Sequence, residues 1–271
     1  MTNTVQDREF SIPLPRDVGV VNWLGMWELY MKEVRRFSKV ATQTVGAPMV
    51  TTVLFLIIFT FAFDRPPLAG VPFSDFLVPG LIMMSIVQNA FANTSSSILI
   101  AKVQGNIVDV LMPPLSAVEM TVAWTGGAVT RGLVVGISSA VAMSFFAEIH
   151  VHSPFLIVYH ALMGATFMAC GGIIGAVWAD KFDHMAAVTN FVITPLTFLS
   201  GTFYTIDRLP EGLRFICHYN PFFYVIDGFR HGFLGQDSTQ VGLGIAVTGL
   251  TALAALIITY LMLKSGYKLK A

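Results

Sequence analysis

Long apolar runs dominate the chain, and charged side chains separate them from one another. Because Asp, Glu, Lys and Arg are costly at the centre of a bilayer, the runs between them mark candidate membrane spans. Each run offers the roughly 20 residues that a transmembrane helix needs. The pattern predicts six spans, at about 43–63, 76–101, 120–147, 154–179, 185–206 and 241–263.

This pattern predicts an all-α integral membrane protein, with a cytoplasmic tail at 1–21 and a single transmembrane domain at 22–271. The tail is polar and broken by prolines, and it lacks the basic start, apolar run and cleavage site of a signal peptide. We find no loop long enough for a soluble domain and no phosphate loop of the form G-x-x-x-x-G-K-S/T. The chain is therefore not expected to bind ATP by that route.

Composition and charge narrow the class of protein further. The chain is 55% hydrophobic and only 12% charged, whereas an average soluble domain carries about 25% charged residues. Its 16 basic and 16 acidic residues balance, which argues against a nucleic-acid-binding protein. Basic residues concentrate in the segments that are cytoplasmic if the N-terminus is inside, so we expect both termini in the cytoplasm.

Residues 22–40 predict an amphipathic helix before the first span. An apolar and aromatic side recurs at helical spacing, and charged residues fill much of the rest. Such a helix suits the inner interface of the membrane, in contact with lipid. A plain extension of the first span is the alternative. The apolar side holds Trp23, Trp27, Tyr30, Met31, Val34 and Phe37, and the polar side holds Glu28, Lys32, Glu33, Arg35, Arg36 and Lys39.

The cytoplasmic loop 102–119 predicts a short helix. Asn106 can cap it, and the pair of prolines at 113 and 114 ends it. Its apolar residues Ile107, Val110 and Leu111 would form a knob that docks into a partner. A tight connection between two spans fits the same residues.

The outer segment 207–235 separates the last two predicted spans, yet it is not polar. Pro210 and Pro221 each stand where a helix can begin, and Asn220 can cap the second one. That second piece is aromatic, and it is too short and too charged to span. We expect a re-entrant or outer-interface helix pair here, because irregular backbone at membrane depth is tolerated where protein buries it. An aromatic belt at the membrane surface is the alternative.

Polar side chains within the predicted spans are candidates for function. Arg131 lies about a dozen residues into the third segment, and a charge inside the membrane is by default a functional hypothesis. A structural partner role is favoured, with snorkelling to the inner interface as the alternative. Gln88, Asn89 and Asn93 put amides into the second span. Packing between helices is favoured for them, and facing a transport path is the alternative.

Signals for chemistry are weak. His150 and His152 are two histidines where a zinc site usually needs three or four protein ligands, so we predict no metal site. We find no nucleophile, base and orienting group in recognisable spacing, and we expect no catalysis by the chain itself. Cys170 lies among apolar residues and is expected to be buried.

Several motifs in order carry a family resemblance. The residues from Asn106 to Leu111, with Pro113 and Glu119, resemble a coupling loop, and Arg131 matches a common position. The stretch 199–204 and the later pairs at 209–210 and 213–214 resemble the segment before the last span. The final signature consists of Asn220, Pro221, Phe222, Tyr224, Asp227, Phe229 and Arg230. Together they resemble the permease subunits of type-2 ABC exporters, from about Trp23 to the end of the chain.

The resemblance implies a six-span permease in the bacterial inner membrane that pairs as a homodimer and binds two copies of a separate ABC ATPase. ATP and Mg would belong to that ATPase, and the permease would be one part of an ATP-driven translocase for polysaccharides, lipids or drugs. The implied coupling helix is Asn106, Ile107, Val108, Asp109, Val110 and Leu111, beside the interfacial helix with Trp23, Trp27, Arg35 and Arg36. The implied outer gate is Asn220, Pro221, Phe222, Phe223, Tyr224, Asp227 and Arg230.

A secondary transporter or channel that is not driven by ATP is the alternative function. Such proteins usually show inverted repeats or functional charges in mid-span. We find no convincing repeat between residues 40–147 and 154–263. The substrate, the choice between homodimer and heterodimer, and the direction of transport do not follow from the residues.

Overall fold

The computed structural model describes residues 19–62, 71–204, 210–235 and 241–269, and within them the secondary-structure elements are helices, as predicted. Most of the predicted tail and the ends of several predicted loops lie outside these residues. In chain order the elements are α1 (Trp23–Ser38), the π-helical turn η1 (Thr42–Gly46), α2 (Ala47–Ala62), α3 (Phe73–Val103), α4 (Ile107–Leu111), α5 (Ala117–Met143), α6 (Pro154–Trp178), α7 (Phe182–Val188), the π-helical turn η2 (Thr189–Ile193), α8 (Thr194–Phe198), α9 (Glu211–Tyr219), α10 (Pro221–Leu234) and α11 (Val241–Ser265).

Five helices in the described part of the chain are long and apolar enough to cross a membrane. They are Thr42–Ala62, which joins η1 to α2, and the four helices α3, α5, α6 and α11. These five coincide with five of the six predicted runs. The remaining run, predicted at 185–206, forms α7, η2 and α8, which end at Phe198, and its last two residues lie outside the described ranges. The sixth crossing therefore stays a prediction.

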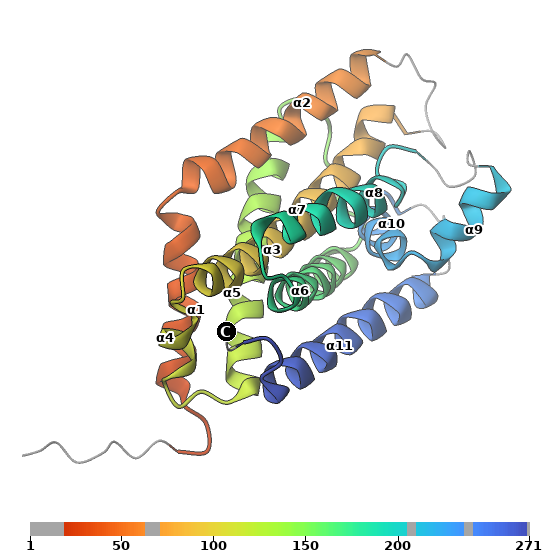
Figure 1. Ribbon diagram of the computed structural model, residues 1–271. Helices are drawn as coiled ribbons and strands as arrows, with labels where there is room; N and C mark the ends of the chain where they lie inside the picture. Colours follow the sequence, from red (N-terminus) through yellow and green to blue (C-terminus); the bar gives the residue numbers. More distant parts are fainter. Residues whose placement is uncertain (1–18, 63–70, 205–209, 236–240, 270–271) are drawn as a thin grey trace, which may run out of the picture.

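The helix α3 is the centre of the bundle (Figure 1). Of its most apolar stretch 89% is buried inside the protein, compared with 11% for Thr42–Ala62. Small residues let the neighbours approach closely: an added Cβ would lie 2.9 Å from Ile86 O at Gly132, and 2.6 Å from Phe91 O at Gly172. The outer helices α2 and α11 instead present apolar side chains that need lipid or another protein to cover them.

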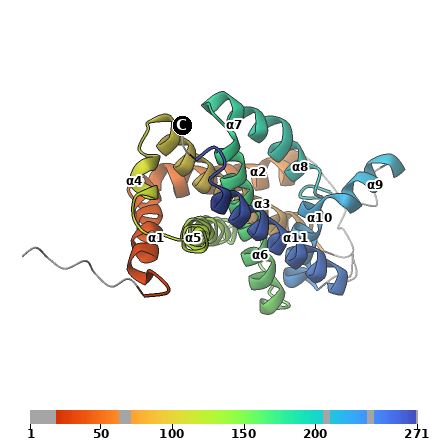
Figure 2. The ribbon, with the colours of Figure 1, turned by 60° about the horizontal axis from the view of Figure 1, so that its bottom comes forward.

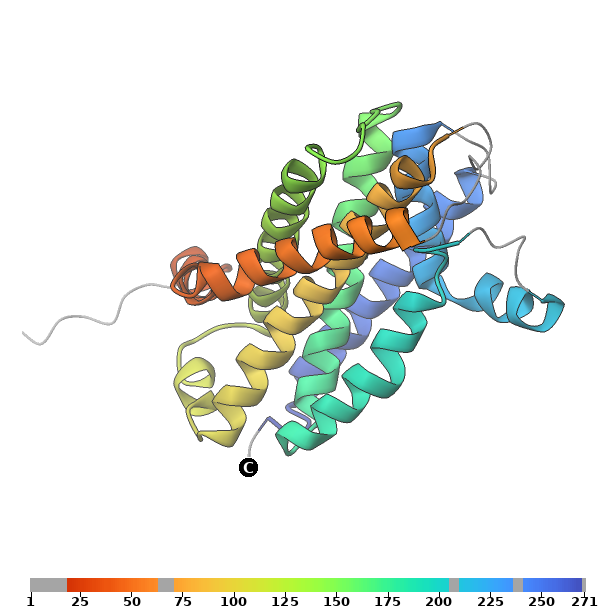
Figure 3. The ribbon, with the colours of Figure 1, turned by 90° about the horizontal axis from the view of Figure 1, so that it is seen from above.

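The first helix, α1, is seen along its axis in Figure 3, where α2, α3 and α6 lie across the view. It runs beside the first half of α5. The Asn22 N–H donates to Glu119 Oε1 at 2.6 Å, and the hydroxyls of Tyr30 and Thr130 lie 3.1 Å apart. An amphipathic helix thus forms as predicted, with Leu29, Glu33 and Phe37 buried against the protein and Trp23 and Trp27 exposed, and its place at the inner membrane interface stays a prediction.

The two ends of the molecule differ in what they carry. The loop with α4 and the C-terminal end of the chain lie on the same side (Figure 2). At the other end α10 packs into the bundle against α3 and α6, while α9 projects away from it (Figure 3). Asn220 caps α10 as predicted, since its Oδ1 accepts from Phe222 N at 3.1 Å. This helix pair exists, and its re-entrant position in the membrane stays a prediction.

Candidate functional site

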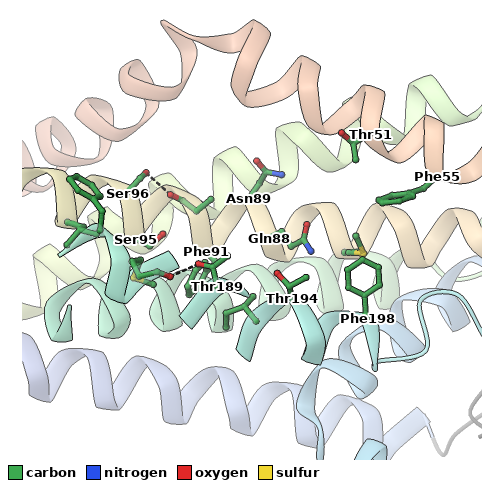
Figure 4. A pocket seen from close by; sticks show the side chains of 16 residues that line it. Thr51, Phe55, Gln88, Asn89, Phe91, Ser95, Ser96, Thr189, Thr194 and Phe198 are labelled. Carbon is green, nitrogen blue, oxygen red and sulfur yellow. Dashed lines mark hydrogen bonds between the residues drawn. The ribbon is translucent and has the colours of Figure 1, made fainter. Parts of the chain in front are cut away.

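A groove of about 600 Å³ runs between α3 on one side and α2, α7, η2 and α8 on the others (Figure 4). Its apolar lining is rich in aromatic rings, from Phe55 on α2 to Phe198 on α8. Its polar lining carries no charged side chain among the residues described. The polar residues that line it are Thr51, Gln88, Asn89, Ser95, Ser96, Thr189 and Thr194.

The polar lining is unusual for a membrane-spanning helix. Hydroxyl and amide groups that face hydrocarbon without a partner are costly, so they normally face protein, water or a polar ligand. Gln88 and Asn89 line the groove, and Asn89 and Asn93 are both buried. The favoured prediction, packing between helices, fits Asn93 and also Asn89, which accepts a bond from α5, whereas the groove-facing alternative fits Gln88 and Asn89. The groove is the best candidate for a path through this subunit.

Glu33 and Arg36 of α1 lie directly behind the groove wall. Glu33 is 0% exposed, although its place in the amphipathic pattern predicted a polar surface residue. Ser97 Oγ donates to Glu33 Oε1 at 2.5 Å, and Asn93 Nδ2 donates to Oε2 at 3.3 Å. Arg36 Nη2 pairs with the same carboxylate at 3.2 Å. The prediction for Glu33 was wrong because distant partners on α3 satisfy its charge, which helical periodicity does not show.

Arg36 also holds the wall itself. Its Nη2 donates to Asn93 O at 2.6 Å and to Asn93 Oδ1 at 3.0 Å, and its Nη1 donates to Ser96 Oγ at 3.0 Å. Since Ser96 lines the groove, one guanidinium connects α1 with the groove surface. Arg35, in contrast, is exposed and forms only a 3.8 Å pair with Glu28. Arg35 and Arg36 were both predicted on the polar side of the helix, but Arg35 is exposed, whereas Arg36 binds buried groups of α3.

Arg131 of α5 reaches the groove from behind as well. Its Nη2 donates to Asn89 Oδ1 at 3.1 Å, so its partner is a side-chain amide rather than a backbone carbonyl or a carboxylate. Asn89 in turn donates from Nδ2 to Ser85 O at 3.0 Å, which fixes the orientation of its amide. The predicted structural partner role therefore has a specific geometry: Arg131 orients an amide of the groove wall.

The helix α4 turns a different face outward from the one its sequence suggested. Ile107 and Val110 are buried in the chain itself, whereas Val108 is 53% and Met112 is 76% exposed. Asn106 stands at the cap position, but its side chain makes no capping bond to the helix and lies 3.4 Å from Gln104 Oε1 instead. A docking knob built on this helix would use Val108 and Met112.

The same end of the molecule offers a second hollow. A groove of about 640 Å³ lies between α1 and the α4 loop and is lined by Asn22, Leu24, Gly25, Glu28, Leu29, Lys32, Asp109, Val110, Pro113 and Leu115. Trp23 and Trp27 stand exposed on α1 nearby in sequence. Apolar groups and charged groups of both signs thus line this groove. Such a mixture is typical of surfaces that bind another protein.

At the opposite end, the predicted gate residues form a packed core. Phe222, Phe223 and Tyr224 are buried. Arg230 donates from Nη2 to Gly201 O at 2.8 Å and from Nε to Phe76 O at 3.3 Å. Its guanidinium carbon also lies 3.9 Å from the centre of the Phe76 ring, a cation–π contact.

Two further residues complete this outer corner. Asn220 donates from Nδ2 to Leu196 O and Ser200 Oγ, each at 3.1 Å, and so ties α10 to the end of α8. Asp227 is buried one turn before Arg230 on α10. The structure therefore brings the predicted gate residues together and fastens them to α3 and α8, both of which line the groove.

The fold and the groove define a multi-pass membrane protein with a partly polar groove beside its central helix. Residues 25–234 match the family described as ABC-2 type transporter. The chain belongs to this family, and it is the transmembrane permease subunit of an ABC transporter. The matched range covers α1, the groove, the α4 loop and the α9–α10 pair.

Curated relatives agree with the family. The chain is 34% identical to "Inner membrane transport permease YadH" of Escherichia coli strain K12 over 92% of this chain and 98% of that protein. It is 25% identical to "Nodulation protein J" of Rhizobium leguminosarum bv. viciae over 84% of this chain and 88% of that protein. A "Nodulation protein J" of Rhizobium meliloti strain 1021 is 21% identical over 83% of this chain.

Proposed function

We propose that this permease works as a pair of identical chains in an export complex of the bacterial inner membrane, with two copies of a separate ABC ATPase bound to them. ATP and Mg would be held by the ATPase. The similarity to "Inner membrane transport permease YadH" of Escherichia coli supports the location. A topology with six spans and both termini in the cytoplasm agrees with the distribution of basic residues.

The surface formed by α1 and α4 is the proposed ATPase docking site. The exposed apolar side chains are Val108 on α4, Met112 directly after α4, and Trp23 and Trp27 on α1. The groove of about 640 Å³ between the two helices would receive a complementary part of the partner. Because the buried side chains Ile107 and Val110 pack α4 against the bundle, a movement of the bound ATPase would displace the bundle as well as α4.

The observation that carries the proposal is the uncharged polar groove along α3. Two of its walls, α2 and α3, belong to helices that are apolar enough to span a membrane, and the groove is partly open. A second copy that covers the open side would enclose a path lined by hydroxyls, amides and aromatic rings. The fastened group at Asn220, Phe222 and Arg230 would gate the outer end of that path.

The first test is affinity purification of the tagged chain in mild detergent, with identification of the proteins that co-purify. We expect a stoichiometric partner with a G-x-x-x-x-G-K-S/T loop. The variants Val108→Asp and Met112→Asp place a charge on the exposed face of α4 and should lose this partner. Val110 is unsuitable for the test because it is buried, and a charge there would disturb folding.

A matched control separates docking from folding. Phe146→Asp changes an exposed apolar residue just after the other end of α5, and it should keep the partner. Recovery of the wild-type chain without an ATPase, together with transport that needs no ATP, would reject the proposal in favour of a secondary transporter.

A further inference from the structure

Lys102, in the last turn of α3, holds the end of another helix. Its Nζ donates to three carbonyl oxygens at the C-terminus of α6, those of residues 176, 177 and 179, at 3.1, 2.7 and 2.7 Å. All three hydrogens of the ammonium group therefore have acceptors on α6.

Lys268 completes the arrangement from the other side. It lies in the turn that follows α11, and its Nζ donates to Trp178 O at 3.2 Å and to Asp180 Oδ2 at 2.9 Å. The carbonyls at 176–179 are those that a helix C-terminus leaves without backbone partners, and the two lysines supply donors to all four. Positive charge also suits the negative end of the helix dipole.

Capping of the α6 end does not by itself require donors from distant parts of the chain. A helix end is commonly capped from its own following residues. Here the donors come from segments that are 74 to 77 and 90 residues away, and they tie the ends of α3, α6 and the chain into one junction. This junction lies at the end of the molecule that carries α4 (Figure 2).

On one side the junction leads to α4. Lys102 is followed by a turn in which Gly105 has φ of +76°, and α4 starts at Ile107. The buried side chains Ile107 and Val110 fasten α4 to the bundle. A displacement of α4 is therefore transmitted through this short connection to Lys102.

On the other side the junction leads to the groove wall. The helix α7 begins at Phe182, a few residues after the capped end of α6, and both Phe182 and Met185 line the groove. Met185 also packs onto Gly175 of α6, where an added Cβ would lie 2.8 Å from Met185 Cε. The position of the α6 end thus sets the position of α7.

We propose that Lys102 is a positioning residue that transmits movement of α4 to the α7–α8 wall of the groove, with Lys268 holding the same helix end from the opposite side. The inference rests on the proposed docking of an ATPase at α4. It adds a specific route from that docking site to the groove, through the four carbonyls of α6.

The test is hydrogen exchange, read by mass spectrometry, on the complex of the tagged chain with its co-purified ATPase, with and without Mg-ATP. In the wild type we expect Mg-ATP to change exchange in the loop 104–115 and also in 182–198. In Lys102→Met the change in the loop should remain, and the change in 182–198 should be lost. A purely structural cap would alter exchange equally in both nucleotide states.

Two controls sharpen the result. Lys102→Arg keeps a cationic donor and should keep both changes, and Lys181→Met removes an exposed charge from the same corner and should keep both as well. If Lys102→Met does not assemble, Lys268→Met decides, with a weakened response in 182–198 expected and an unchanged one contradicting the proposal.

Other outcomes separate the two proposals. A full response of 182–198 in Lys102→Met, or a wild type in which only the loop responds, would overturn the route through Lys102. A wild-type complex in which the loop 104–115 does not respond would instead contradict docking at α4, and the route that depends on it.

Discussion

The Glu33 carboxylate of α1 lies 2.5 Å from the Ser97 hydroxyl of α3, fully buried from solvent. A charge in such a place is tolerated because Arg36 and Asn93 satisfy the second carboxylate oxygen. The backbone comes close here too: an added Cβ on Gly127 of α5 would lie 2.5 Å from Glu33 Cβ. Three helices therefore meet at one carboxylate.

Replacing this carboxylate should destabilise the permease. In Glu33→Gln the amide loses the ion pair with Arg36 and turns a donor toward the Ser97 and Asn93 donors. Breaking a buried pair costs about 3–5 kcal/mol, and we expect the lower end because the Arg36 side chain is 30% exposed. Thermal unfolding of the purified chain in detergent measures the change.

Glu28→Gln is the matched control, because Glu28 lies on the same helix and pairs with Arg35 at 3.8 Å at an exposed site. Its effect should be within about 1 kcal/mol, the usual value for a surface ion pair. Equal effects of the two substitutions would show that the buried network contributes nothing specific.

Helix packing gives a prediction with a neighbouring control. In Gly172→Ala the added Cβ would lie 2.6 Å from Phe91 O, and closer still to Thr94 Oγ1, so α3 and α6 must separate. Overpacking of this kind costs about 1–3 kcal/mol of unfolding free energy.

Gly171→Ala is the neighbouring control. There the atom nearest to the added Cβ would be Phe91 Cδ2, at 4.0 Å. Because Ala favours helices by about 1 kcal/mol over Gly, this substitution should be neutral or stabilising. Unfolding midpoints in the reverse order would contradict the close packing.

Local features of the fold were predictable from sequence, whereas the contacts between segments were not. The apolar runs and the Asn220 cap depend on neighbouring residues, so periodicity and capping rules reveal them. Glu33 was misplaced because its partners Asn93 and Ser97 lie 60 and 64 residues away. Nothing near Lys102 in sequence shows which carbonyls it caps, because they lie 74 to 77 residues away.

In the candidate site, too, local features could be predicted from sequence and contacts between distant segments could not. The amides at Gln88 and Asn89 could be noticed in an apolar run, but only the arrangement of α2, α7 and α8 shows that they line a groove. A short helix forms where it was predicted, at Ile107–Leu111, but its outward face differs from the prediction, and its coupling role stays a prediction. Five residues are too few for periodicity to show which side is buried.

Arg131 gives a prediction about the groove wall. In Arg131→Leu, Asn89 loses the donor that reaches its Oδ1, and the wall amide is free to reorient. We expect loss of export function, and the readout is ATP hydrolysis by the complex in lipid vesicles together with its assembly. Arg131→Lys can donate one bond to Asn89 and should retain part of the function. An Arg131→Leu variant that assembles and works as the wild type does would rule out a role for this pair.

The junction at the end of α6 predicts a dependence on pH. The hydrogen bond from Lys268 holds the pKa of the Asp180 carboxyl below its usual range, and that bond to Asp180 raises the pKa of Lys268. The Asp180 contribution to stability is therefore present above its unfolded-state pKa of about 4 and is lost as pH falls through its depressed folded-state pKa. The Lys268 contribution is present below its unfolded-state pKa of about 10 and is lost as pH rises through the raised value.

Asp180→Asn tests this dependence directly. Both groups are at the solvent-exposed end of the molecule, so the effect on the unfolding midpoint should be small and should decrease with added salt. The difference between the wild type and Asp180→Asn should be largest near neutral pH and should vanish once the pH is below the depressed pKa of the folded state, where the carboxyl is protonated. Asp183→Asn, on the first turn of α7, is the matched control and should show no such loss. A difference that stays constant from neutral to acidic pH would mean that Asp180 acts through its shape alone, and that its charge does not hold Lys268 at the end of α6.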